Sequence, residues 1–108
     1  MTGRQRTREE DLAVLYLRNR SISQSDPAIT ELAEATGRSE ASIWMRKGNF
    51  DALDPSVPEA GLGRVAEVTR KVWAEYQHDP QRILSEARAA YRSLLVINQV
   101  RLERILDA

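Results

Sequence analysis

The chain has 108 residues, with 16 Lys and Arg against 16 Asp and Glu, so no global basic charge draws it to nucleic acid. This length predicts one domain with a modest core, and the lack of cysteine excludes disulfides, thiol catalysis and cysteine-ligated zinc. No apolar run approaches the roughly 18 residues that cross a bilayer, and no signal peptide opens the chain, so we expect a cytoplasmic protein without membrane contact.

Residues 1–6 carry no apolar periodicity and are expected to form a flexible basic arm. One interpretation gives this arm no role. The other lets Arg4 and Arg6 follow phosphates or a minor groove, as N-terminal arms of some DNA-binding domains do.

A first helix is predicted from Thr7, because Thr7 and Glu10 are spaced as in a capping box, and its apolar pattern fades near Asn19. Asp26 and Pro27 then predict the start of a second helix.

The second helix is predicted to end at Gly37, and Ser39 is the expected N-cap of a third. Ala33 is small enough for a close crossing of the two helices, and Ile43 is the apolar anchor of the third. These features predict a helix-turn-helix, with simple helix packing as the alternative.

Residues 51–63 contain two prolines and two glycines and are predicted to be a connector. Gly61 and Gly63 lack the preceding strand and the third glycine of a nucleotide-binding loop, so we interpret them as a turn. An apolar stripe then predicts a fourth helix, formed by Val65, Val68, Thr69, Val72, Trp73 and Tyr76. His78, the only histidine, is expected to be solvated or to cap that helix.

A final helix is predicted from Pro80 to about Leu106. Its second half is apolar on too much of its circumference for one neighbour, which favours a homodimer over burial within its own domain. The predicted dimerisation residues are Leu94, Leu95, Ile97, Leu102, Ile105 and Leu106. The expected fold is all-α: a helix-turn-helix domain over residues 7–78, with a three-helix core and a fourth helix, and a long C-terminal helix over 79–108.

The outward face of the third helix, predicted over residues 39–49, follows from a helical wheel with Ile43 pointing inward. Ala41, Ser42, Met45 and Asn49 then point outward, and Arg46 lies at the edge of that face. Ser42 and Asn49 could hydrogen-bond base edges, whereas Ala41 or Met45 could contact a thymine methyl. Arg46 could reach phosphate or guanine, and Ser39 with the helix N-terminus could hold a phosphate.

The run from Thr7 through Trp73 resembles the N-terminal DNA-binding region of bacterial HNH-endonuclease, restriction-type proteins. The resemblance is carried by Gly37-Arg38-Ser39, by Met45-Arg46, by Asn49-Phe50 and by Leu53-Asp54-Pro55. It implies DNA binding but no cleavage, because an HNH site needs several histidines and this chain has one. In the family an apolar residue usually stands where Lys47 stands here.

The leading hypothesis is a non-enzymatic protein that binds double-stranded DNA in a sequence- or modification-dependent way. It would act as a small dimeric regulator, such as a transcription repressor, with the third helix in the major groove. The alternative is a protein-interaction or assembly module that keeps the helix-turn-helix as a scaffold. No catalytic residues, metal site or cofactor are predicted, because no nucleophile–base pair or metal cluster stands at a telling spacing.

Overall fold

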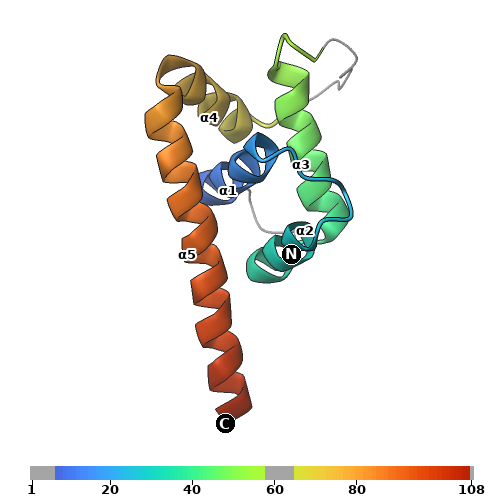
Figure 1. The fold of residues 1–108 in the computed structure, drawn as a ribbon, viewed down its shortest axis with the longest axis vertical. Helices are drawn as coiled ribbons and strands as arrows, with labels where there is room; N and C mark the ends of the chain where they lie inside the picture. Colours follow the sequence, from blue (N-terminus) through green and yellow to red (C-terminus); the bar gives the residue numbers. More distant parts are fainter. Residues whose placement is uncertain (1–6, 58–64, 108) are drawn as a thin grey trace.

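The computed structural model describes residues 7–57 and 65–107, which form five α-helices and no strand. The helices are α1 (Arg8–Asn19), α2 (Pro27–Thr36), α3 (Glu40–Leu53), α4 (Glu67–His78) and α5 (Pro80–Asp107). The long α5 runs along one side of the other four, and its C-terminal end extends beyond them (Figure 1). The predicted all-α class and long C-terminal helix are confirmed.

Helix α1 is the central element and contacts all four other helices. It begins where predicted, because Thr7 is extended and its hydroxyl accepts a hydrogen bond from the Glu10 N–H at 3.1 Å. Five apolar side chains of this helix are almost fully buried: Leu12, Ala13, Val14, Leu15 and Leu17.

The turn between α2 and α3 is built from three local signals, and all three predicted caps are confirmed. The Asp26 carboxylate accepts from the Ala28 N–H at 2.9 Å, with Pro27 in the first turn. Gly37 has a φ of 68°, a left-handed conformation that closes α2 at little steric cost for glycine. The Ser39 hydroxyl then accepts from the Ser42 N–H at 3.0 Å and starts α3.

The predicted start of the connector at residue 51 is wrong, because α3 continues to Leu53. Asp51 lies in the last turn and pairs with Arg18 and Lys47, which keeps that turn attached to the domain. The helix ends at Asp54, whose backbone is extended as expected for a residue that precedes a proline. Gly61 and Gly63 lie outside the described residues.

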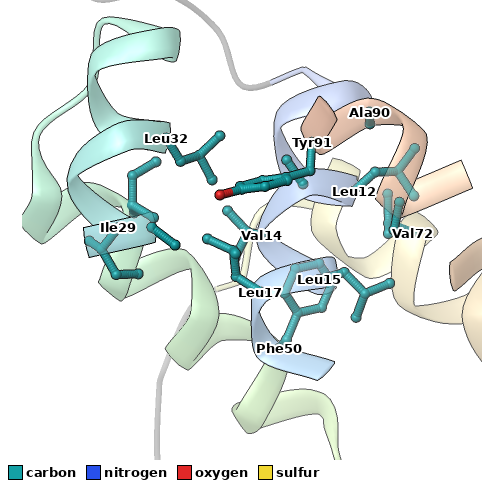
Figure 2. Packing of buried hydrophobic residues seen from close by; sticks show 14 of the residues in the cluster. Leu12, Val14, Leu15, Leu17, Ile29, Leu32, Phe50, Val72, Ala90 and Tyr91 are labelled. Atoms are coloured by element: carbon teal, nitrogen blue, oxygen red, sulfur yellow. The ribbon is translucent and has the colours of Figure 1, made fainter. Parts of the chain in front are cut away.

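The core is one continuous cluster that includes the first half of α5 (Figure 2). Ile83, Ala87 and Tyr91 of α5 are buried in this cluster, and the Tyr91 ring centroid lies 5.1 Å from that of Tyr16 in α1. The N-terminal half of α5 is therefore part of the same hydrophobic core as α1 to α4.

Helix α4 buries Thr69, Val72 and Trp73 of its predicted stripe, whereas Val65 lies just before the helix. His78 is exposed at the end of the helix. The Asp79 carboxylate accepts from the Arg82 N–H at 3.3 Å, which supports the first turn of α5. Within residues 7–57 and 65–107, no helix is both long and apolar enough to span a membrane.

Candidate functional site

The outer face of α3 presents four of the predicted DNA-contacting residues. Ser39 and Ala41 are exposed, Ser42 is half-buried, and Met45 is 59% exposed. The side chains of this face are small or apolar and carry no charge, so they can offer a hydroxyl and methyl groups to a binding partner. Their role in binding stays a prediction.

The predicted orientation of Arg46 and Asn49 is wrong, because Arg46 is 0% exposed and Asn49 is 5% exposed. The helical wheel took Ile43 as the centre of a narrow buried face. Helix α3 contacts α1, α2 and α4, so its buried arc is wider and includes positions 43, 46, 49 and 50. Neither Arg46 nor Asn49 can contact a base edge in this conformation.

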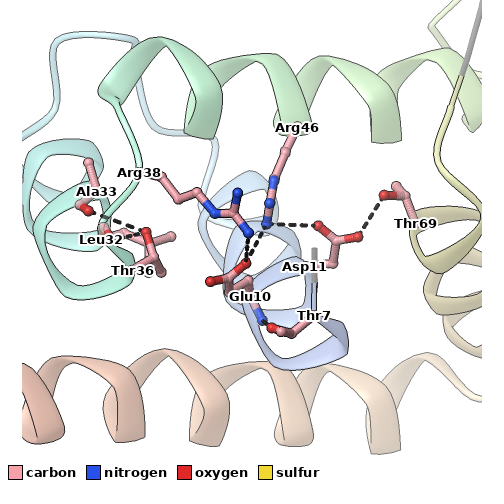
Figure 3. Close-up of polar contacts among 9 residues, drawn as sticks. All are labelled: Thr7, Glu10, Asp11, Leu32, Ala33, Thr36, Arg38, Arg46 and Thr69. Carbon is pink, nitrogen blue, oxygen red and sulfur yellow. Dashed lines mark hydrogen bonds and ion pairs between the residues drawn. The ribbon is translucent and has the colours of Figure 1, made fainter. Parts of the chain in front are cut away.

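Arg46 instead enters a buried network of charged side chains between α1 and α3 (Figure 3). Its Nη1 atom lies 3.2 Å from Glu10 Oε1 and 3.4 Å from Asp11 Oδ1. Arg38, from the turn before α3, places Nη2 3.0 Å from the same Glu10 oxygen. Thr69 of α4 donates its hydroxyl hydrogen to Asp11 Oδ2 at 2.6 Å.

This network fixes the orientation of α3 relative to α1, the α2–α3 turn and α4. Taking a charge out of water is costly, and a buried ion is tolerated when its partners supply opposite charge and hydrogen bonds. Two carboxylates and two guanidinium groups meet here, so the formal charges of the four side chains cancel. Rotating α3 about its axis would separate Arg46 from its partners, which holds the exposed face in one direction.

The remaining cation of α3, Lys47, is also paired. Its ammonium lies 2.7 Å from Asp51 and 5.0 Å from the centre of the Trp44 ring, and Trp44 packs partly buried against the core. Arg18 of α1 bridges Asp51 at 2.8 Å and Asp54 at 2.6 Å.

The position of Arg18 has a consequence for Asp54. The Arg18 guanidinium lowers the pKa of Asp54 from its ordinary 3.8 to about 2, together with hydrogen bonds that Asp54 accepts from the Ser56 N–H and hydroxyl. Asp54 therefore stays ionised and holds the end of α3 against α1 over the whole physiological pH range.

The basic residues that the sequence places near the turn therefore do not form a free positive patch. Arg38, Arg46 and Lys47 are all engaged with carboxylates of the same chain. Arg4 and Arg6 lie outside the described residues. The part of the chain that the structure describes also contains no group of three or more His, Cys, Asp or Glu side chains that could hold a metal ion.

A signal for the buried network was present in the sequence. Asp11 lies three residues before Val14 and four before Leu15, on the apolar face of α1. A carboxylate on such a face requires a buried cation, and Arg46 occupies the matching stripe of α3 between Ile43 and Phe50. Pairing Asp11 with Arg46 would have placed Arg46 in the core.

The predicted dimerisation residues of α5 divide into two groups. Leu94 and Leu95 are half-buried and pack against the core cluster. The others are exposed along residues 96–107, which we call the free end of α5. The exposed fractions are 61% for Ile97, 45% for Leu102, 63% for Ile105 and 83% for Leu106.

No protein-family model matches the chain, and no curated protein or solved structure matches it either. The resemblance to the DNA-binding region of HNH endonucleases thus rests on its sequence motifs alone. In the structure, the motif residues divide into two groups. Arg46, Asn49 and Phe50 are buried and Arg38 and Asp54 form ion pairs, whereas Gly37, Ser39, Met45 and Pro55 are exposed. The motif therefore combines residues that hold α3 in place with two residues, Ser39 and Met45, that lie on its outer face.

Proposed function

We propose that this chain is a non-enzymatic protein that binds double-stranded DNA, with α2 and α3 acting as a helix-turn-helix. The observation that supports the proposal is the outer face of α3, which is exposed at Ala41 and Met45 while its inner face is held by buried ion pairs. A helix presented in one fixed orientation can enter a major groove without losing conformational freedom on binding.

The chemistry of this face suits base edges better than phosphates. The Ser42 hydroxyl can donate to or accept from a base edge, and Ala41 and Met45 can pack on thymine methyl groups. Ser39, at the exposed N-terminus of α3, can receive a phosphate. Because the three cations near the turn are already paired, we expect few phosphate contacts and a shallow dependence of affinity on salt.

The test is selection from a random duplex library, with unmodified and base-modified pools, followed by gel-shift titration of the selected duplex. Met45→Glu places a negative charge on the outer face of α3 and should abolish binding with little loss of helix content. Gln77→Glu, an equal charge change at an exposed position of α4, is the matched control and should bind normally. If no duplex is enriched even at low salt, the protein does not bind DNA through this face.

A second candidate function, a protein-interaction or assembly module, is favoured by a different observation. The free end of α5 exposes a run of large apolar side chains, whereas α2 and α3 expose little uncompensated positive charge. Such a module should tolerate Met45→Glu fully and should lose its partner when Ile97 or Ile105 is changed to Asp. Comparing these variants in one binding assay separates the two functions.

A further inference from the structure

The free end of α5 carries an apolar surface that no described residue covers. Six exposed residues line it: Val96, Ile97, Val100, Arg101, Arg104 and Ile105. Arg101 donates a hydrogen bond to the Asn98 side chain at 2.6 Å, and no ion pair joins Arg101 or Arg104 to a described residue. Exposed apolar surfaces of this kind mark sites of association, and this one carries positive charge that is free to meet a partner.

A groove lies between the start of α1 and the N-terminal half of α5, and we call it the α1–α5 groove. It is lined by Arg8, Glu9 and Leu12 of α1 and by Glu86, Ala89, Ala90 and Ser93 of α5. The side chains of Ala89, Ala90 and Ser93 are short, so another helix can lie close to the α5 backbone there.

The charge around Glu86 in this groove is negative. Two guanidinium groups and four carboxylates gather there through shared ion pairs or a shared groove wall: Arg8 and Arg82 with Glu9, Glu75, Asp79 and Glu86. Glu9 is exposed and forms no ion pair with a described residue. Four negative and two positive charges leave a formal charge of −2, which suits a basic partner.

The α1–α5 groove and the apolar surface lie on the same side of α5. The helix runs from Pro80 to Asp107. Glu86 and Arg104 are 18 residues apart in it, which is five full turns at about 3.6 residues per turn. Their side chains therefore leave the helix in the same direction, at points roughly 27 Å apart along its axis.

We propose that a second copy of this chain occupies the groove, with the two α5 helices antiparallel about a two-fold axis beside position 95. This position is midway between Glu86 and Arg104. A two-fold axis places one side of α5 against the same side of the second copy, so Arg104 of each copy meets Glu86 of the other. A parallel pair would place Arg104 against Arg104 instead and would leave both grooves empty.

The second arginine is also directed to a carboxylate in this register. Arg101 is 18 residues from Ile83, so it leaves the helix on the side on which Ile83 is buried in the core. In the antiparallel pair this side of the free end faces α1 of the second copy. Arg101 therefore points toward Glu9, the groove residue without an ion pair among the described residues.

The same register covers the apolar side chains of the free end. Ile97 faces Ser93 of the second copy, and Val100 packs on Ala89. Burial of the two apolar side chains supplies affinity, and the charge pairs select the register. The inference stands apart from DNA binding, since it concerns only how two copies associate.

Sedimentation equilibrium on the full chain tests the pairing. The unmodified chain should show the mass of two copies. Arg104→Glu brings like charges together twice, so its dissociation constant should be at least about tenfold higher. Arg88→Glu makes the same charge change at an exposed position nearly half a turn away from the Arg104 direction, and this matched control should remain paired.

A cysteine pair tests the register. The chain contains no cysteine, so Glu86→Cys with Arg104→Cys introduces the only two thiols. Within one chain they are roughly 27 Å apart, whereas a disulfide spans at most about 7 Å between Cα atoms. Oxidised glutathione should therefore link two copies into one closed pair, and a non-reducing gel should show no larger species.

The matched control is Arg88→Cys with Arg104→Cys, whose thiols lie on opposite sides of α5 and should leave the chain unlinked. Far-ultraviolet circular dichroism verifies that all variants keep their helix content. A single-copy mass for the unmodified chain would overturn the proposal, as would an Arg104→Glu variant that pairs as tightly as Arg88→Glu. A ladder of larger species from the 86 and 104 cysteines would also overturn it, because it would indicate head-to-tail contacts.

Discussion

Arg46 Nη1 lies 3.2 Å from Glu10 Oε1, and both side chains are buried between α3 and α1. This contact joins α3, with its exposed outer face, to the helix at the centre of the core. A change at Arg46 would therefore act through the orientation and stability of α3, and through them on the DNA binding that we propose.

Replacing Arg46 with Met should lower the free energy of unfolding by about 3–5 kcal/mol, because Glu10 and Asp11 would be left as buried charges without this partner. Urea unfolding followed by circular dichroism measures the loss. The control is Lys71→Met, which removes an exposed pair with Glu67 and should cost below about 1 kcal/mol. Equal losses in the two variants would show that the buried network contributes nothing particular to stability.

Thr69 tests the same network from α4. Thr69→Val keeps the shape of the side chain but removes the hydroxyl that donates to Asp11 at 2.6 Å, so a buried carboxylate oxygen loses a donor. We expect a loss of about 1–3 kcal/mol in the same unfolding measurement. Thr30→Val removes an exposed hydrogen bond to Glu40 and is the matched control, with little expected change. A small effect at both positions would contradict the assigned role of Thr69.

The features predicted correctly from the sequence are those that adjacent residues determine. The caps at Thr7, Asp26 and Ser39 depend on a side chain and on backbone groups within three residues of it. The left-handed end of α2 depends on Gly37 alone. These signals act before any tertiary contact forms, so a single sequence reveals them.

The orientation of α3 could not be obtained in this way, because it depends on which helices surround it. A wheel centred on Ile43 assumes one neighbour, whereas three helices contact α3, and Arg46 and Asn49 are both buried. The positive charge of Arg46 also favoured the wrong orientation. An arginine near a turn suggests a DNA contact, but Glu10 and Asp11 lie more than thirty residues earlier and neutralise it in the folded chain.

Gly37 and Gly48 should respond in opposite directions to replacement by Ala. Gly37 has a positive φ, so Gly37→Ala should destabilise the protein by about 1 kcal/mol. Gly48 lies inside α3 in a regular helical conformation and is only half-buried, so Gly48→Ala should stabilise by about 0.5–1 kcal/mol. Thermal unfolding of the two variants beside the unmodified chain gives both signs. A loss of stability on replacing Gly48 comparable to that on replacing Gly37 would contradict this prediction. It would mean that close packing around Gly48, and not its backbone conformation, determines the effect of the replacement.

Asp54 should make part of the stability depend on acid pH. Its pKa is lowered from 3.8 to about 2, chiefly by the hydrogen bond from Arg18, and its side chain is only 17% exposed. A lowered pKa in the folded state adds stability that is complete above pH 3.8 and is lost as the pH falls through 2. Asp54→Asn should therefore remove up to about 2 kcal/mol of the decline in unfolding free energy between these pH values.

Ser56→Ala is the control. It keeps the Arg18 contact and removes one hydroxyl hydrogen bond, so it should flatten the decline less. Urea unfolding at a series of pH values measures the slope for each variant, and an Asp54→Asn slope equal to that of the unmodified chain would show that the Arg18 pair does not support the end of α3.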